Sequence, residues 1–197
     1  MSRNRFIITQ TLLSSWNWIY KSDSGYDDFI KTLNKQGIRP TQAILDGRKF
    51  ENMVTAYCEG HPPEQGHQWY NGICSVGEVV RNGAFQVKLY KDVTVKGVDF
   101  LLYGILDVLK CGEIFDIKFS KTYHVGKYLD SPQHPMYFEL CPEARKFTYI
   151  VSNGKDVYRE EYLRENVEPI EREIVLFMDF LEKQNLVDIY CEKWRSK

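Results

Sequence analysis

Apolar and polar residues follow two different periods along this chain. From residue 84 to 120 they alternate with a period of two, through FQVKLYKDVTV, VDFLLYGILDVL and EIFDIKFS. This alternation predicts three successive antiparallel strands. A fourth strand is predicted at KFTYIVS, residues 146–152. The other segments have helix caps or a period near 3.6, so we expect mixed α/β structure.

Helices are predicted before and after the three strands in the sequence, at residues 9–20, 26–34, 65–81 and 132–140. The apolar stripe from Phe50 to Cys58 predicts a further helix, with Asp46 as N-cap and Gly60 at its end. Residues 166–184 place apolar side chains on one face and acidic ones on the other, so we expect this helix to cover the core. Its apolar face consists of Val167, Ile170, Ile174, Phe177, Met178 and Leu181.

Length and composition indicate one folded unit. The chain has 197 residues, of which 43% are hydrophobic and 14% aromatic, enough for one sizeable core. We predict a single domain over 1–197, with N-terminal helices in 1–82, the sheet and a following helix in 84–141, and a strand and long helix in 146–197.

Charge and cysteine content restrict the function. Lysine plus arginine number 26 and aspartate plus glutamate 27, so a nucleic acid would have to meet a local basic patch or bound cations. The five cysteines form no C-x-x-C pair, which indicates a reduced, intracellular protein. The N-terminus lacks a signal-peptide apolar region, and the longest apolar run, 100–106, is too short for a bilayer. We therefore expect a cytoplasmic protein with no membrane partner.

Two acids face each other across the predicted hairpin. Alternation places Asp116 and Lys118 on one face of their strand. A two-residue turn at Cys111 and Gly112 then sets Asp107 opposite Asp116, with Cβ atoms about 5 Å apart. Two carboxylates so placed repel each other, and Asp107 lies in an apolar run, so this pair requires a compensating charge.

Two interpretations of these acids are open. In the first, Asp116 and Lys118 belong to a solvated face and Asp107 is a satisfied core acid, paired with Lys118. In the second, a divalent cation removes the repulsion, and oxygen ligands favour magnesium or manganese. A metal, an activated water and the Lys118 cation together suit phosphodiester hydrolysis.

The order Asp107, then Asp116-Ile117-Lys118, on a hairpin in a helix-flanked sheet resembles the PD-(D/E)XK nuclease superfamily. The stretch YGILDVL resembles the Gly-x-x-Asp-hydrophobic pattern of RecB-type and phage lambda-type exonucleases. SPQHPMY supplies Gln133 and Tyr137 as the Q-x-x-x-Y of the RecB-type branch, and Glu51 lies on the early helix where that superfamily often has an acid. The resemblance covers residues 44 to 140.

This resemblance implies an α/β fold with a restriction-endonuclease-like core: a mixed β-sheet whose antiparallel hairpin carries the acids, with helices on both faces. It implies Asp107, Asp116 and the carbonyl of Ile117 as ligands of magnesium or manganese. Lys118 would position the attacking water or stabilise developing charge. Glu51 would reach the metal through water or bind a second ion, and Asp46 and Glu59 are its rivals.

The same resemblance implies that Gln133 and Tyr137 contact DNA near the scissile phosphate. The alternative is a helix start with a core tyrosine, and Pro135 between them could restart the helix. The chain departs from the family at Leu106, where the motif has proline, and in having no histidine on the early helix. Its cysteines lack the clustering of the iron–sulfur relatives, so we expect no iron–sulfur cluster.

A local basic patch is expected near the acids. Lys118, Lys121, Lys127, Arg145 and Lys146 supply it, with Lys121 and Lys127 as further DNA contacts. We therefore predict a divalent-metal-dependent DNA nuclease, an exonuclease of recombination, repair or phage DNA processing, encoded by a phage or a cell. The alternative is a non-catalytic module on the same fold that binds nucleic acid or protein.

Overall fold

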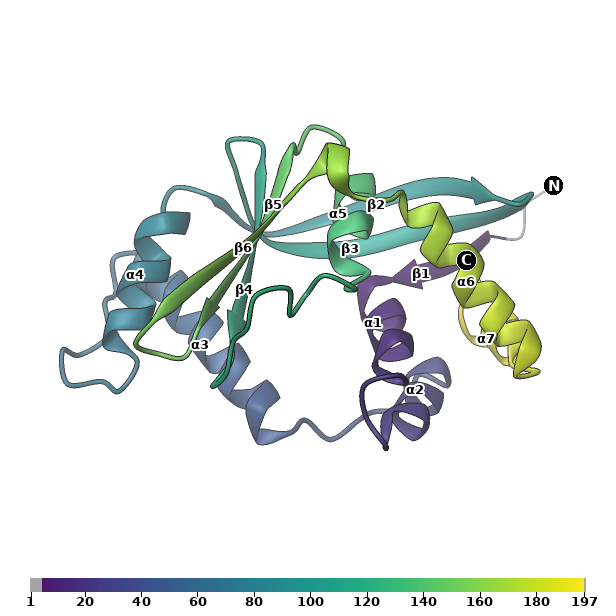
Figure 1. Cartoon of the computed structure of the whole chain (residues 1–197), viewed down its shortest axis with the longest axis horizontal. Helices are drawn as coiled ribbons and strands as arrows, with labels where there is room; N and C mark the ends of the chain where they lie inside the picture. Colours follow the sequence, from purple (N-terminus) through teal and green to yellow (C-terminus); the bar gives the residue numbers. More distant parts are fainter. Residues whose placement is uncertain (1–4, 197) are drawn as a thin grey trace.

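A six-stranded mixed sheet forms the centre of the molecule (Figure 1). The computed structural model describes residues 5–196. Across the sheet the order is β1-β3-β4-β5-β6, and β2 pairs with the other edge of β3. The β1–β3 and β4–β5 pairs are parallel and the others antiparallel. The strands are β1 (Arg5–Thr9), β2 (Ala84–Val95), β3 (Val98–Lys110), β4 (Glu113–Phe119), β5 (Lys146–Ser152) and β6 (Val157–Leu163).

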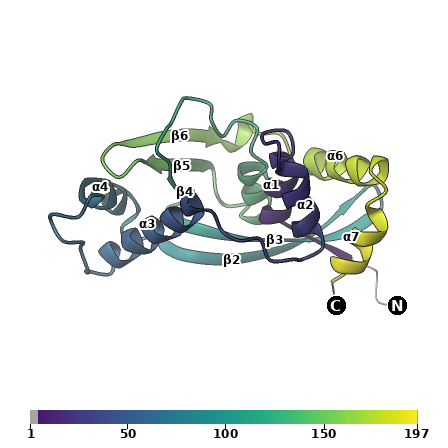
Figure 2. The same cartoon turned by 90° about the horizontal axis from the view of Figure 1, so that it is seen from below.

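Helices cover both faces of this sheet (Figure 2). They are α1 (Gln10–Trp18), α2 (Gly25–Leu33), α3 (Gln42–Cys58), α4 (Tyr70–Val80), α5 (Gln133–Leu140), α6 (Ile170–Lys183) and α7 (Val187–Lys193). Ile114 of β4 packs in a larger core with α1, α2, α5, α6 and α7, whereas its neighbour Phe115 packs in a smaller core with α3 and α4. Successive strand residues point to opposite faces, so the predicted mixed sheet with helices on both faces is confirmed.

Three elements escaped the sequence analysis: β1, β6 and α7. The predicted helix at 9–20 begins at Gln10, because residues 5–9 pair in parallel with β3 and Thr9 then caps α1. The hydroxyl of Thr9 accepts a hydrogen bond from the Leu12 N–H at 3.1 Å. Strand β6 is an edge strand whose sequence, VYREEYL, is largely polar and exposed, so no alternation marked it.

Two helix starts also differ from prediction. Asp46 is not an N-cap, because α3 begins at Gln42, and the Thr41 hydroxyl accepts the Ile44 N–H at 3.4 Å. The long helix α6 begins at Ile170, after Pro169 and a short 3-10 turn at Arg164–Asn166. Its core-covering role is confirmed, since the side chains of its apolar face are fully or partly buried.

The predicted hairpin is present with the predicted register. Cys111 and Gly112 have φ angles of 51° and 75°, as a two-residue type I′ turn requires. The β3–β4 pairing runs from Lys110 opposite Glu113 to Val108 opposite Phe115, and ends there. Asp107 and Asp116 are next in register, but β4 has begun to leave β3 at that point.

The edge of β3 that faces β1 and β4 is interrupted. Strand β1 pairs with residues 99–103 of β3, and β4 pairs with residues 108–110. Residues 104–107 have no strand partner on that side among the pairings of the described chain. This interruption lies where the predicted acids are, and it opens the sheet edge to a cavity.

Elsewhere, the five cysteines are all free thiols. Within residues 5–196, no helix combines the length and the apolar character of a membrane span.

Candidate active site

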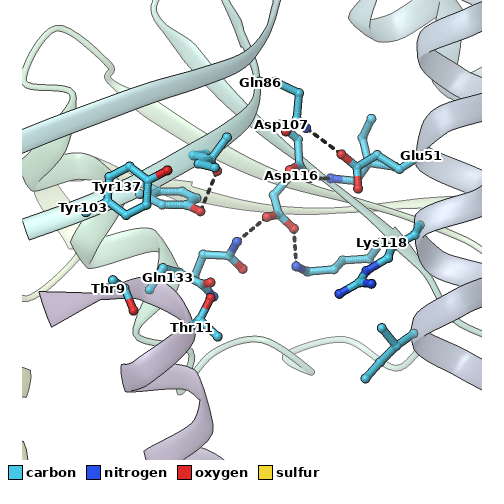
Figure 3. A pocket seen from close by; sticks show the side chains of 16 residues that line it. Thr9, Thr11, Glu51, Gln86, Tyr103, Asp107, Asp116, Lys118, Gln133 and Tyr137 are labelled. Atoms are coloured by element: carbon cyan, nitrogen blue, oxygen red, sulfur yellow. Dashed lines mark hydrogen bonds and ion pairs between the residues drawn. The ribbon is translucent and has the colours of Figure 1, made fainter. Parts of the chain in front are cut away.

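A cavity of about 680 Å³ lies at the interruption of the β3 edge (Figure 3). Its walls come from helices α1, α3 and α5, from strands β2, β3 and β4, and from the end of β1. The structure brings into this one cavity every residue predicted as a ligand, catalytic group or Q-x-x-x-Y member: Glu51, Asp107, Asp116, Ile117, Lys118, Gln133 and Tyr137. Lys121 and Lys127 are not among its lining residues.

Asp116 is the most enclosed acid of the cavity, with 1% of its surface exposed. Its Oδ2 lies 2.6 Å from the Lys118 Nζ, and its Oδ1 accepts a hydrogen bond from the Gln133 side-chain amide (Figure 3). Burial raises the pKa of Asp116, although both partners favour its charged form. For Lys118, burial opposes the charge, but attraction to Asp116 and Asp107 prevails and raises its pKa, so it is an ammonium ion.

The Asp107 side chain accepts a hydrogen bond that a backbone carbonyl of a paired strand would otherwise accept. Its Oδ2 accepts the backbone N–H of Ile117 at 2.9 Å, at the point where β4 separates from β3. Burial, then repulsion from Asp116 and Glu51, raises the pKa of Asp107 well above its ordinary value. Asp107, Asp116 and Glu51 therefore outnumber the single Lys118 beside them, and water solvates this part of the cavity poorly.

Glu51 reaches the cavity from α3, and its predicted rivals do not. Burial and then the Asp116 charge raise the pKa of Glu51. Its Oε1 accepts a hydrogen bond from the Gln86 Nε2 at 2.7 Å. Asp46 instead accepts a bond from Gln42 on the exposed side of the helix, and neither it nor Glu59 lines the cavity.

Gln86 was not predicted as a residue of the site. It has a left-handed φ of 52° on β2, and the β2–β3 ladder omits the Gln86–Asp107 pair. On one side of this point Val87 and Leu106 pack in the larger core; on the other, Phe85 and Val108 pack in the smaller one. Such a backbone conformation is costly for a non-glycine residue. At Gln86 and Asp107, the side chains of the β2–β3 hairpin change from packing in the larger core to packing in the smaller core.

Helix α5 presents Gln133 and Tyr137 to the cavity on one face, as expected from their spacing. Pro135 lies in the first turn, where proline is tolerated, and does not restart the helix. Tyr137 is 4% exposed and its hydroxyl donates to the Ile105 carbonyl at 2.8 Å. Gln133 and Tyr137 are thus both engaged within the chain, and Gln133 holds Asp116 in place.

Gly104 of the YGILDVL stretch makes room for this helix. A Cβ atom at Gly104 would lie 2.6 Å from the Tyr137 Cε1, closer than carbon atoms approach. The glycine three residues before Asp107 and the tyrosine four after Gln133 are therefore one packing unit. It fixes α5 against β3 and brings Gln133 to Asp116.

Of the predicted basic patch, Lys118 alone lines the cavity. Lys127 donates to Ser120 and Thr122 and so fastens its own loop. Lys146 pairs with Glu113 at the far end of β4 and β5, and the Arg145 backbone contacts the hairpin turn. The cavity cations are Lys118 and Arg48.

Arg48 could have been predicted as a cavity residue from its spacing to Glu51 on α3. It precedes Glu51 by three residues, so the two share a helix face, and both line the cavity. Thr9, which caps α1, and the first two residues of that helix, Gln10 and Thr11, line it from another side. A helix N-terminus presents unpaired N–H groups and favours anions.

The cavity offers only a few oxygen ligands to a hard metal cation. In residues 5–196, no group of three or more His, Cys, Asp and Glu side chains is arranged to hold a metal ion. The acid pair Asp107 and Asp116, with the Ile117 carbonyl, offers oxygen atoms alone, which suit magnesium or manganese. Lys118 occupies one Asp116 oxygen as the chain stands.

Comparisons with known proteins identify a similar fold but indicate no activity. No family model matches the chain, and no curated protein matches its sequence. The crystal structure of SSO0001 is similar over 91% of this chain and 78% of that one, at 16% identity and a TM-score of 0.52. That of Scheffersomyces stipitis Rai1 aligns over 93% and 62%, at 13% identity and a TM-score of 0.34. The SSO0001 likeness shows a shared fold, and the Rai1 score is too low to support an argument.

Proposed function

We propose that this chain is a divalent-metal-dependent nuclease of the PD-(D/E)XK type, which hydrolyses phosphodiester bonds of DNA. The observation that carries the proposal is the meeting of Asp107, Asp116 and Lys118 in one cavity at an open sheet edge. Asp116 is buried and Asp107 is half-buried beside it, and two carboxylates so placed favour a bound cation.

Asp107, Asp116 and the Ile117 carbonyl would hold magnesium or manganese. When bound, the ion supplies a water of lowered pKa and neutralises charge on the phosphate. The chain's own part is to fix the acids: Gln133 orients one Asp116 oxygen, and the Ile117 N–H orients Asp107.

Lys118 exchanges partners in this proposal. In the structure its ammonium lies against Asp116; with substrate present it turns to a phosphate oxygen and stabilises the charge that develops there. Arg48 and the first turn of α1 flank the cavity, where they contact the neighbouring phosphates of the bound strand. Glu51, held by Gln86, accepts a proton or orients a water beside the acids.

The Lys118–Asp116 contact also favours a second candidate, the non-catalytic module. An acid neutralised by a lysine within the chain needs no metal, and the cavity would then serve only to bind a nucleic acid or a protein. The two candidates differ in one observable property, which is bond cleavage.

The test is digestion of three DNA substrates by the full chain: linear duplex, closed circular duplex and single strands. Each is incubated with magnesium, with manganese, or with a chelator. We expect the linear forms to be degraded from their ends with either metal and the circle to survive, as for an exonuclease. Absence of cleavage in every condition, with DNA binding retained, would establish the module instead.

A further inference from the structure

We propose that two stacked tyrosines beside the cavity, Tyr90 and Tyr103, bind the bases of a single-stranded nucleic acid whose backbone enters the cavity. This inference rests on the proposed function and specifies the strand that the site accepts. The juxtaposition that carries it is a stacked aromatic pair with one member in the cavity wall and the other exposed beside it.

The geometry of the pair suits base stacking. The ring centroids of Tyr90 and Tyr103 are 4.8 Å apart, with an interplanar angle of 27°. Tyr103 lines the cavity, and Figure 3 shows it across the cavity from Glu51 and Lys118. Tyr90 is 61% exposed. The pair therefore extends the cavity wall onto the open surface of the β2–β3 hairpin.

The pair belongs to a row of residues that leads to the acids. Tyr90 is opposite Tyr103, and Lys88 is opposite Ile105; residues two apart on a strand share a face. On β3 the row continues to Asp107, since Tyr103, Ile105 and Asp107 all line the cavity. From Tyr103 to Asp107 the strand extends about 13 Å, a distance that a few nucleotides cover. A base on the tyrosines and a phosphate at the acids can therefore belong to one strand.

The chemistry of this face favours a single strand over other occupants. Bases expose their flat faces in single strands, whereas a duplex keeps them stacked inside, and aromatic rings bind any base. The exposed β2 residues beside Tyr90 are the charged Lys88 and Asp92, whereas the centre of a protein–protein interface is depleted of charged residues. Lys88 lies between the rings and the acids, where the strand's phosphates would pass.

The test is fluorescence anisotropy of a labelled 20-nucleotide oligothymidine with the full chain in calcium, which occupies such sites without turnover. We expect Tyr90→Ala to weaken binding by about 5-fold or more, since the variant loses the ring on which a base stacks. Tyr90→Phe retains the ring and should bind as wild type does. Tyr158→Ala is the matched control, because Tyr158 is also exposed and stacked, on Tyr123 with centroids 5.0 Å apart.

The salt dependence distinguishes stacking from a general structural effect. Tyr90→Ala should leave the slope of log Kd against log salt unchanged, because an uncharged contact releases no counterion. Lys88→Ala should reduce that slope by about 0.7. Melting temperatures of all variants verify that each is folded.

Three outcomes separate this inference from the nuclease proposal. Equal oligothymidine binding by Tyr90→Ala and wild type overturns the inference, and so does a wild type that cleaves blunt duplex but does not bind the single strand. Binding that depends on Tyr90 without any cleavage supports the inference and removes the nuclease proposal.

Discussion

Asp107 supplies at the residue scale what a neighbouring strand supplies elsewhere in the sheet. Its carboxylate accepts the Ile117 N–H after the β3–β4 ladder has ended. That bond keeps the backbone of β4 satisfied while the strand turns away, and so holds the cavity open. The arrangement places a second carboxylate near Asp116, and burial and then repulsion from Asp116 raise the pKa of Asp107.

The variant Asp107→Asn tests the cost of the Asp107 charge. An amide oxygen can accept the same Ile117 bond without the charge, so we expect the free energy of unfolding in chelator to rise by about 1 kcal/mol or more. Urea unfolding measures it, with Asp46→Asn as control, because Asp46 lies outside the cavity. Magnesium should stabilise the wild type and have little effect on Asp107→Asn. A variant no more stable than wild type in chelator would show that the acids do not strain the fold.

The acids and Lys118 could be predicted because a two-residue turn fixes hairpin register, and register fixes which side chains meet. Lys121 and Lys127 were predicted from nearness in sequence alone, and the loop that carries them runs outside the cavity walls. Gln86 could not be found, because its left-handed backbone conformation is imposed by the packing of both cores and leaves no mark in the residue type.

At the scale of elements, the site depends on how α5 packs on β3. Tyr137 of the helix lies on the backbone of Gly104, and the Ile105 carbonyl accepts its hydroxyl. This contact sets the height of the helix over the sheet, and Gln133 is one turn away. Any group added at Gly104 must therefore move the residue that orients Asp116.

We expect Gly104→Ala to destabilise the protein by about 1–3 kcal/mol, the usual cost of an overpacked core. The cost should fall in part when Tyr137 is replaced by leucine, because the added Cβ meets the tyrosine ring at 2.6 Å and Leu140 at 2.8 Å. Gly47→Ala is the control, since an added Cβ there meets no atom within 4 Å. Equal costs of Gly104→Ala in the two backgrounds, measured by chemical unfolding, would contradict the packing account.

The elements that sequence reasoning missed are those defined by distant partners. Strand β1 is five residues long and is a strand because β3 lies beside it, more than 90 residues along the chain. Strand β6 is a largely polar strand at the edge of the sheet, so it is a strand because it pairs with β5. The central hairpin and α6 were predictable because their apolar periods are long and are read from the local sequence.

At the scale of the whole molecule, two cores on opposite faces of the sheet meet at the cavity. The larger core also contains a histidine that the proposed chemistry does not use. His134 is 4% exposed, stacks on Tyr162 with centroids 4.1 Å apart, and lies within hydrogen-bond distance of the Tyr149 hydroxyl. Burial lowers the pKa of His134 to about 4, despite the attraction of Glu160.

This histidine should make the fold sensitive to acid. Between pH 6.5 and 4 the unfolded chain binds a proton at His134 that the folded chain does not, so the free energy of unfolding falls as the pH falls. The loss approaches about 3 kcal/mol when the window has been crossed. His134→Gln should lose this component while it keeps the contributions of other groups. Identical pH dependence of the two proteins in urea unfolding would refute the assignment.

The central claim is that Asp107, Asp116 and Lys118 act together on a phosphodiester bond. Its most direct test is single-turnover digestion of end-labelled linear duplex in magnesium, with DNA affinity measured in calcium. We predict cleavage by wild type, none by Asp116→Asn, and a rate lower by about 100-fold or more for Lys118→Ala, which loses one transition-state contact but still binds DNA. Lys121→Ala, a lysine outside the cavity, should cleave as wild type does. Cleavage that persists in both Asp116→Asn and Lys118→Ala would contradict the account.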